Sequence, residues 1–428
     1  MNARRARLAV WFGMLTLAAC RDPADPAQIG APSFAAGGTG RLSVLVNRNA
    51  DDNGTAKTIQ EGIDMVADGG HVLVLPGTYV ERVVIDKGLT LEGIGGESGD
   101  VVIEQDLAAP APPTDAVIAV TTPDPVVLRN MTVHHVGLRG LSALTAADLT
   151  IERASFHGVW PSSFPVIPVF NNSISLANNA TQSGGRAQLV VRDSRISTDG
   201  LGISAGGDAD ILIERNVIRS TGGCVFVTPI GQGVTVPAGS ETNADILNNE
   251  FPECGQNRPG RNANAVNVFG TVGVETTGTV NIVGNRFRNT IRTAGFCNTA
   301  AIVYEFFSGR IENNSIVDVI QGCADDTPAP RSRPAAIFVG SLLAGMRPAN
   351  VSVRFNDISG NAFAGLRIGS NQTAVDASCN WWGSADGPSG AGLTGAGDAV
   401  VVETGGATPT LLLLFATAPI AGTDATSC

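Results

Sequence analysis

Ile211-Leu-Ile-Glu-Arg-Asn-Val-Ile218 and Val351-Ser-Val-Arg-Phe-Asn-Asp-Ile358 share one pattern: apolar, x, apolar, x, x, Asn, x, apolar. Alternating apolar residues favour a strand with one buried face, because successive side chains of a strand point to opposite sides. An Asn at a fixed place after the strand indicates a turn of fixed geometry. A segment this short cannot bury its own apolar face, so we expect the copies to stack as a solenoid.

The pattern returns along most of the chain. Looser copies carry Asn249, Asn285, Asn314 and Asn380 in the Asn slot, and earlier copies carry Met131, Ala154 and Ser194 there instead. The central apolar residue of successive copies falls at 128, 151, 191, 213, 246, 282, 311, 353 and 377. The smallest intervals, 22 to 24 residues, predict the length of a bare coil, and the longer intervals predict coils that carry loops.

Two solenoid folds have this spacing. Leucine-rich repeats use a similar phrase at periods of about 20–29 residues, and parallel β-helices wind short strands into coils of comparable length. The β-helix is favoured because the apolar slots hold mainly Val and Ile, which suit strands, and because segments such as 220–227 have no helical pattern. We predict an all-β parallel β-helix of about a dozen coils.

One short helix is expected near the start of the folded region. Residues 58–66 place apolar side chains at helical spacing, and Gly69-Gly70 follows as a stop signal. A helix here would cap the first exposed strand edge of the solenoid, where an open edge invites aggregation.

The composition and net charge indicate which classes of partner are disfavoured. The chain has 428 residues, of which 43% are hydrophobic and 16% charged, and its formal net charge is −11. The apolar content suffices for a long, narrow core, and the negative charge disfavours nucleic acid and anionic lipid headgroups. It also disfavours polyanionic glycans unless cations bridge the contact.

The N-terminal residues predict export. A basic start and a short apolar run end in Leu17-Ala-Ala-Cys20, which resembles the lipobox of bacterial lipoproteins. The resemblance implies a signal peptide over 1–19, lipidation of Cys20, and a membrane anchor in the cell envelope, at the outer membrane. Residues 20–40 are rich in Pro, Ala and Gly and predict a flexible tether, which leaves 41–428 as a single β-helix domain. We expect a monomer.

The remaining six cysteines predict disulfides, since an exported chain meets an oxidising environment. Neighbouring coils lie one strand spacing apart, within disulfide reach. We therefore predict pairs between cysteines that are neighbours in sequence, namely Cys224–Cys254, Cys297–Cys323 and Cys379–Cys428. No Cys or Cys/His cluster of the kind that holds a metal is present in the sequence.

The stretch from 58 to 93, with Gly77, Tyr79 and Glu81, resembles the N-terminal region of pectinesterase-like proteins. The repeats resemble the right-handed parallel β-helix of the pectin-lyase-like superfamily, and the phrase 379–388 is similar to one in bacterial and archaeal surface proteins of that fold. The resemblance covers most of 42–420 and implies the fold. It does not imply pectinesterase activity, because the motifs that carry the catalytic groups of that family are missing.

Polysaccharide lyases of this fold hold Ca²⁺ in an acidic site beside a basic residue that abstracts a proton. The resemblance therefore implies that this chain could carry a similar site. The candidate catalytic residues are Arg192, Asp199, Asp208, Asp210 and Arg215. The alternative is structural, because the position after the central apolar residue carries alternating charges in successive coils. These residues, Arg129, Glu152, Arg192 and Glu214, would pair as a ladder.

Histidines define a candidate binding site. His134 and His157 occupy equivalent positions 23 residues apart, so they should lie on neighbouring coils about 5 Å apart. Together with His135 and Trp160 they could bind a sugar beside an aromatic ring. The alternative is a stacked polar ladder near a turn.

The row of Asn residues is predicted to be structural, with side chains bonded from coil to coil. The leading functional hypothesis is a non-catalytic, lipid-anchored protein whose long face binds a glycan or another cell-surface component. The alternative is a Ca²⁺-dependent polysaccharide lyase or another carbohydrate-active enzyme, and a third hypothesis is a structural stalk. We expect no cofactor, except Ca²⁺ if the protein is a lyase.

Overall fold

The computed structural model describes residues 40–49, 55–105, 116–143, 147–159, 172–178, 185–228, 239–255, 264–270, 277–288, 300–319, 335–341, 347–361, 363–403, 410–412 and 415–419. All of them belong to one compact unit, residues 35–428. The predicted signal peptide (1–19), Cys20, the tether up to residue 39, Trp160, Cys297, Cys323 and Cys428 lie outside the described residues.

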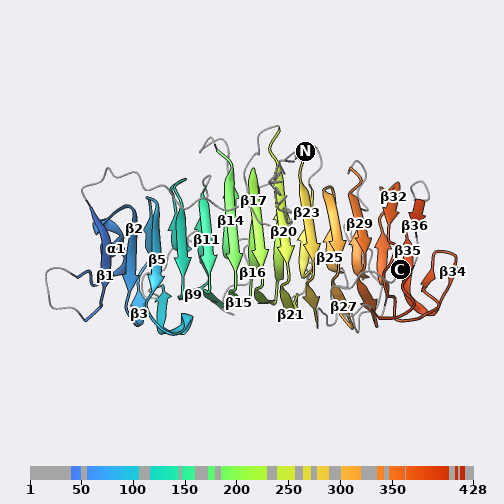
Figure 1. Ribbon diagram of the computed structural model, residues 1–428, viewed down its shortest axis with the longest axis horizontal. Coiled ribbons are helices and arrows are strands. Elements are labelled where there is room, and N and C mark those ends of the chain that lie inside the picture. The colour runs from blue at the N-terminus through green and yellow to red at the C-terminus, as the bar shows by residue number, and fades with distance from the viewer. Residues whose placement is uncertain are drawn as a thin grey trace, which may run out of the picture. The chain divides into compact units, whose positions relative to one another are not determined.

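Three sheets run along the stack of coils (Figure 1). Sheet A has thirteen strands in the spatial order β1 (Arg41–Val46), β2 (Val66–Val74), β5 (Leu89–Gly93), β8 (Val126–Arg129), β11 (Asp148–Glu152), β14 (Ala187–Arg192), β17 (Ala209–Glu214), β20 (Thr242–Leu247), β23 (Thr279–Val283), β26 (Ser308–Glu312), β29 (Asn350–Arg354), β32 (Ala374–Asp376) and β36 (Thr410–Leu412).

Sheet B follows sheet A in each coil and has ten strands. They are β3 (Gly77–Val80), β6 (Val101–Glu104), β9 (Thr132–Val136), β12 (Ser155–Val159), β15 (Arg195–Thr198), β18 (Val217–Ser220), β21 (Glu250–Cys254), β24 (Arg286–Phe287), β27 (Ser315–Val317) and β30 (Asp357–Ser359).

Sheet C closes each coil and has thirteen strands. In chain order they are β4 (Val83–Ile85), β7 (Ala116–Val120), β10 (Arg139–Ala143), β13 (Asn172–Asn178), β16 (Leu201–Gly207), β19 (Gly223–Thr228), β22 (Val266–Val268), β25 (Ala300–Tyr304), β28 (Ala335–Val339), β31 (Leu366–Ile368), β33 (Pro388–Gly390), β34 (Leu393–Thr394) and β35 (Gly397–Val402).

From β2 to β32 successive strands therefore visit sheets A, B and C in turn, and each strand from β2 to β29 pairs with the strand three places later in the chain. Within the described residues all strand pairs are parallel except β33 with β34. This is the predicted right-handed parallel β-helix, and the ten strands of sheet B mark ten complete coils. Inward side chains form one continuous apolar cluster from Val44 to Val400.

The helix α1 (Ile59–Met65) caps one end of this core, as predicted. Thr58 and Glu61 form a reciprocal capping box at its start, and Ile59 and Ile63 are fully buried. The predicted stop was wrong: the chain enters β2 directly at Val66, and Gly69-Gly70 lie inside that strand. The packing of α1 against β1, β2 and β4 ends the helix earlier than the glycines would.

The fixed Asn is explained by a turn between sheets A and B. The residue before the Asn slot has a left-handed backbone in every copy of the phrase, with φ between 47° and 71°; these residues are Asn130, Arg153, Asp193, Arg215, Asn248, Gly284, Asn313, Phe355 and Cys379. A non-glycine residue costs about 1–2 kcal/mol in this conformation. In six of the nine copies a buried Asn follows, and its bonds, described next, offset that cost.

The buried Asn side chains form a continuous amide ladder. The Oδ1 atom of Asn249 accepts from the backbone N and the Nδ2 of Asn216, at 2.9 and 3.0 Å, while Nδ2 of Asn249 donates to the carbonyl of Ile213 at 2.8 Å. The same contacts recur through Asn285, Asn314, Asn356 and Asn380. The predicted structural role of this row is confirmed.

Candidate functional site

The pectinesterase-like motif has a structural role in this chain. The Tyr79 ring is buried and its hydroxyl donates to the Leu75 carbonyl at 2.9 Å. The Glu81 carboxylate accepts from the backbone N–H groups of Ile59 and Gln60, at 2.8 and 3.0 Å, which stabilises the N-terminus of α1. The motif therefore fixes the capping helix to the first coil.

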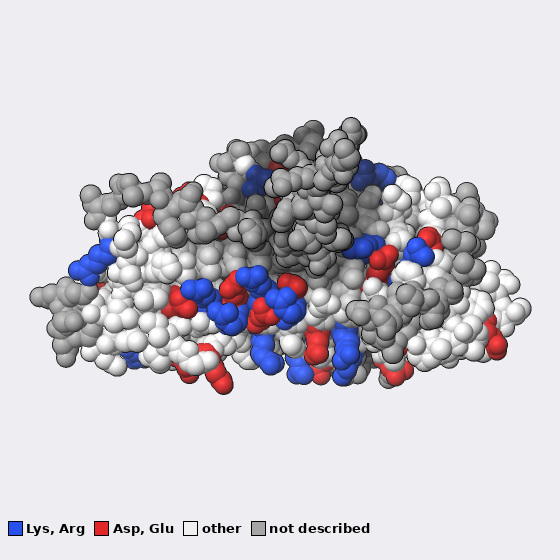
Figure 2. Space-filling model, in the orientation of Figure 1, with Lys and Arg blue, Asp and Glu red and all other residues white. Residues whose placement is uncertain are grey.

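The predicted charge ladder is present on the outer face of sheet A. Glu92, Arg129, Glu152, Arg192 and Glu214 are aligned in register on five consecutive strands. Arg129 contacts Glu92 at 2.7 Å, and Arg192 donates to Glu152 through Nε at 2.8 Å. Figure 2 shows acidic and basic side chains gathered in an alternating band across the middle of the molecule. Arg192 therefore belongs to this ladder.

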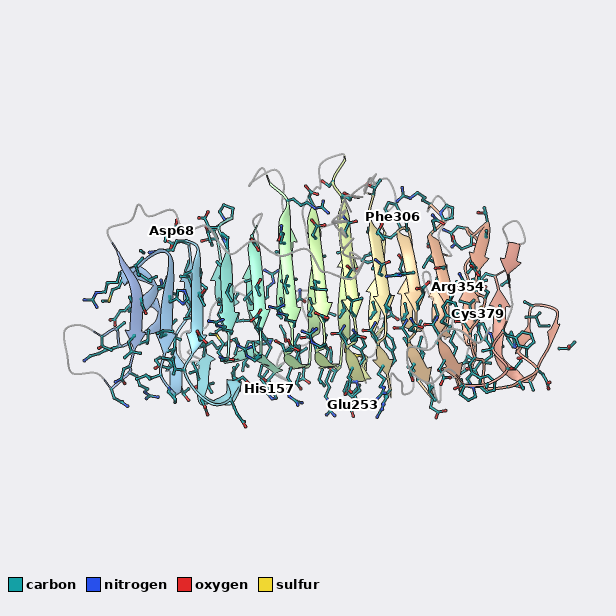
Figure 3. All side chains as sticks on the ribbon, viewed as in Figure 1. Asp68, His157, Glu253, Phe306, Arg354 and Cys379 are labelled. Atoms are coloured by element: carbon teal, nitrogen blue, oxygen red, sulfur yellow. A yellow bond between two sulfur atoms is a disulfide. The ribbon has the colours of Figure 1, made fainter. Side chains whose placement is uncertain are left out.

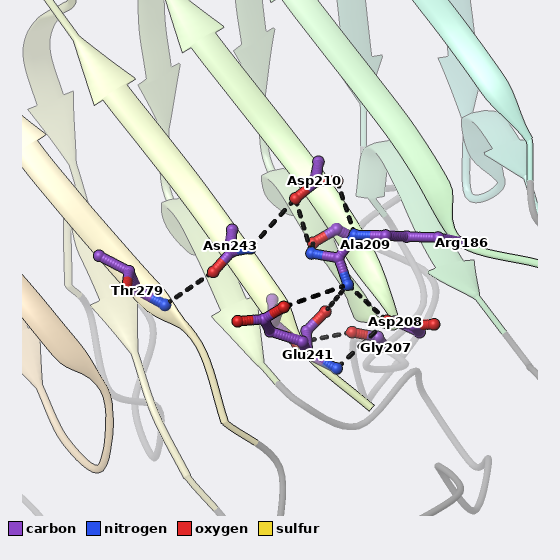
Figure 4. Close-up of polar contacts among 9 residues, drawn as sticks. Arg186, Gly207, Asp208, Ala209, Asp210, Glu241, Asn243 and Thr279 are labelled. Atoms are coloured by element: carbon purple, nitrogen blue, oxygen red, sulfur yellow. Dashed lines mark hydrogen bonds and ion pairs between the residues drawn. The ribbon is translucent and has the colours of Figure 1, made fainter. Parts of the chain in front are cut away.

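Asp208 and Asp210 converge on a residue that the sequence did not single out. Arg186 lies just before β14; it holds Asp210 with two hydrogen bonds of 2.6 Å and contacts Asp208 at 2.6 Å (Figure 4). Its guanidinium also donates to the backbone carbonyl of Glu241 at 2.8 Å. The hydrogen bonds from Arg186 lower the pKa of Asp210, and the same pairing raises the pKa of Arg186. This arrangement keeps Arg186 protonated and therefore unsuited to abstract a proton.

The other lyase candidates lie elsewhere in the coil. Arg215, after the end of β17, holds Asp193 through two hydrogen bonds of 2.8 and 2.9 Å, which lower the pKa of that carboxyl group. Asp199 lies on the turn after β15, where its backbone N–H donates to Gly158 and its carbonyl accepts from Thr221. Asp208 and Asp210, by contrast, lie at the start of β17. The five candidates thus do not meet at one point: Asp208 and Asp210 share Arg186, Arg192 and Arg215 lie near Asp193, and Asp199 lies on the turn after β15.

The predicted histidine pair is present on sheet B. His134 and His157 are in register on β9 and β12, and their ring centroids lie 5.6 Å apart in an edge-to-face arrangement. The structure adds Glu104, which is in register with His134 on β6, with Oε2 3.7 Å from His134 Nδ1. Sequence reasoning missed Glu104 because strand 101–104 has no copy of the Asn phrase to set its register.

The row continues across further coils. Ser197 is in register with His157, Arg219 with Ser197, and Glu253 with Arg219, so six consecutive strands each present one polar side chain on the same outer line. Figure 3 shows His157 and Glu253 on the same lower side of the ribbon. We call Glu104, His134, His157, Ser197, Arg219 and Glu253 the sheet B row.

His135 does not belong to this surface. It is fully buried; Nδ1 lies 2.8 Å from the Leu138 carbonyl oxygen and Nε2 lies 3.0 Å from the Ser173 hydroxyl. Alternation along β9 sends neighbouring side chains to opposite faces, so only one of the two adjacent histidines can face solvent. Its place in the predicted binding site is not supported.

The cysteines agree with the prediction where the structure describes them. Cys224 and Cys254 form a disulfide with a Cα–Cα distance of 5.7 Å. Cys379 is also disulfide-bonded, and its partner lies outside the described residues. The Cys297–Cys323 and Cys379–Cys428 pairs stay predictions.

We expect the Cys224→Ala/Cys254→Ala double variant to lose about 2–4 kcal/mol of unfolding free energy. The bond spans 30 residues, and opening such a loop raises the entropy of the unfolded chain. Urea denaturation followed by far-UV circular dichroism would measure the loss. A double variant that unfolds at the wild-type urea concentration would show that stacking alone holds these coils together.

The sequence matches no established family profile and no curated protein. Solved structures with a similar arrangement include an alginate lyase from Paenibacillus sp., at 11% identity and a TM-score of 0.43, covering 83% of this chain and 96% of that one. The mannuronan C-5 epimerase A-module of Azotobacter vinelandii is similar at 14% identity and 0.42, covering 82% and 94%. Pectin methylesterase from carrot is similar at 12% and 0.36, covering 76% and 84%.

Strand pairing defines the class of protein as a right-handed parallel β-helix. Among the described residues, no helix has both the length and the apolar character needed to cross a membrane.

Proposed function

We propose that this protein is an exported, lipid-anchored β-helix that binds a glycan along sheet B without transforming it. The sheet B row carries the proposal. It presents Glu104, His134, His157, Ser197, Arg219 and Glu253 on six consecutive coils in one register. Evenly repeated hydrogen-bonding groups along a line suit a polymer whose own groups repeat along a line.

The chemistry of the row favours a glycan of little net charge. Acidic, neutral and basic side chains follow one another, and Arg219 lies 3.9 Å from Glu253, so with neutral histidines the two glutamates and one arginine leave a formal charge of only −1. A strongly anionic polymer would also meet the negative charge of the whole chain, −11. The rival proposal, a Ca²⁺-dependent lyase, receives less support because Asp208 and Asp210 are already paired with Arg186.

The test measures binding of the purified protein to a panel of neutral and uronate polysaccharides at about 0.15 M salt. Arg219→Ala should weaken binding of the best neutral glycan about tenfold, because a hydrogen bond to a charged group contributes roughly 1.5–3 kcal/mol. Arg310→Ala on sheet A is the matched control: Arg310 and Arg219 are 54% and 55% exposed, and each lies near one glutamate. Equal effects of the two variants would contradict the proposal.

A second arm tests for catalysis. The protein is incubated with polyuronates and Ca²⁺, and absorbance of unsaturated products is followed. We expect no increase. Product formation that Arg186→Ala abolishes would replace the binding proposal with the lyase.

The lipid anchor has its own test. We expect metabolic labelling with a fatty-acid analogue in a bacterial host to label the wild-type chain and not the Cys20→Ala variant. The variant should then leave the membrane fraction, since a cleaved chain without acyl groups has lost its anchor. Labelling that persists in Cys20→Ala would contradict lipidation at this residue.

A further inference from the structure

His134 and His157 have the arrangement of a pair of metal ligands. The chain has four histidines. His135 is buried, with both ring nitrogens at hydrogen-bonding distance from partners inside the fold, and His71 lies alone on β2, paired in register with Ser43 and Thr90. His134 and His157 are thus the one pair of imidazoles that the described strands place side by side on an outer face.

The spacing of the two rings suits a shared metal ion. A Zn–N distance of about 2.0–2.1 Å places the ion roughly 3 Å from the centre of each ligating imidazole. Two such rings around a tetrahedral ion therefore have centres about 5 Å apart. The observed separation is 5.6 Å. The His134 side chain is 43% exposed, so small rotations of exposed rings can bring both nitrogens to one point.

Glu104 supplies the remaining group that such a site needs. Its Oε2 atom lies 3.7 Å from Nδ1 of His134. A carboxylate beside one ring nitrogen favours the tautomer that carries a proton there and leaves Nε2 free to bind a metal. The carboxylate also offsets part of the charge of a bound cation.

We propose that His134 and His157 bind Zn²⁺ at the surface of sheet B, with Glu104 orienting His134 and water completing the coordination. Among the described residues no three metal-binding side chains surround a common point, so the protein would supply two imidazoles and the other ligands would come from solvent. The ion would add a Lewis acid to the sheet B row, where a hydroxyl-rich or carboxylate ligand could complete its coordination sphere. This inference does not depend on the proposed glycan binding.

Isothermal titration of the tag-free, chelator-treated protein with ZnCl₂ tests the site. We expect one equivalent of Zn²⁺ to bind the wild type and no saturable binding to His134→Gln or His157→Gln. Glu104→Gln should weaken binding about tenfold, the usual effect of losing a group that orients a ligand. CaCl₂ should not compete, because Ca²⁺ prefers oxygen ligands.

His71→Gln is the matched control, since it removes an outer-face imidazole that has no imidazole neighbour in register. It should bind Zn²⁺ like the wild type. Circular dichroism of each variant verifies that the β-helix is intact. We expect no change, because all of the substituted side chains lie on the outer faces of the sheets. The proposal is wrong if His134→Gln keeps wild-type affinity, or if His71→Gln loses as much as His134→Gln.

Discussion

Replacing Asn285 with alanine should lower the free energy of unfolding by about 3–5 kcal/mol. The side chain is 1% exposed. Its Oδ1 accepts from the backbone N and Nδ2 of Asn249, and its Nδ2 donates to the carbonyls of Ile246 and Val283. Alanine removes all of these buried hydrogen bonds and takes away the acceptor of the Asn249 backbone N–H. A buried group that loses its partner costs roughly 1–3 kcal/mol, and each further buried hydrogen bond contributes about 1 kcal/mol.

Urea denaturation followed by circular dichroism measures the effect, and Asn281→Ala on β23, the strand that precedes Asn285, provides the control. Asn281 is partly exposed and donates to Asp245 at 2.8 Å, so we expect a loss below about 1 kcal/mol. Asn285→Ser should fall between the two, because Ser194 fills the same slot in an earlier coil and its hydroxyl accepts from the Ala154 N–H at 3.1 Å. An Asn285→Ala variant no less stable than Asn281→Ala would refute a stabilising ladder.

Replacing Trp382 with alanine should lower the unfolding free energy by a similar amount, about 3–5 kcal/mol. Trp382 is the largest fully buried side chain of the described residues. An alanine would leave a cavity beside Gly365, which lies close against the Trp382 ring. Because this residue closes the last Asn-marked coil, the cavity would also open one end of the apolar column.

Trp381→Ala is the control for Trp382→Ala. Trp381 is partly exposed, and its coil-to-coil bonds are made by the backbone: its N–H donates to the Asn356 carbonyl at 2.9 Å, and its carbonyl accepts from the Ile358 N–H at 2.8 Å. Trp381→Ala keeps both bonds, so we expect a loss of less than about 1 kcal/mol. Thermal melts of the two variants would distinguish them, and equal melting temperatures would contradict this difference in burial.

Much of the fold could be predicted because the Asn phrase sets the register of sheet A. Once two phrases are aligned, Glu152 must lie beside Arg192, His134 beside His157 and Asn216 beside Asn249, and all three pairs are observed. The Cys224–Cys254 disulfide was predicted on a different ground, by pairing cysteines that are neighbours in sequence. Stacked coils convert a sequence alignment directly into spatial contacts.

The candidate sites were harder to predict where that register gives no information. Arg186 precedes its strand and reaches Asp208 and Asp210 on the next coil, and no local pattern marks such a contact. The partner of His134, Glu104, lies on a strand without the phrase. His135 was expected in the candidate binding site because the alternation of side chains along a strand was neglected. That alternation directs the His135 side chain into the interior.

The amide ladder also keeps the distance between coils constant while the number of residues in each coil varies. Residues bonded through it are 24 to 42 positions apart in sequence, yet the Asn-to-Asn hydrogen bonds keep nearly the same length throughout. In the sequence the extra residues fall between the strands, and the spacing of the ladder does not change with their number. Peptides of different length could therefore be exchanged between strands, so new recognition surfaces could be installed or evolve without refolding the scaffold that carries them.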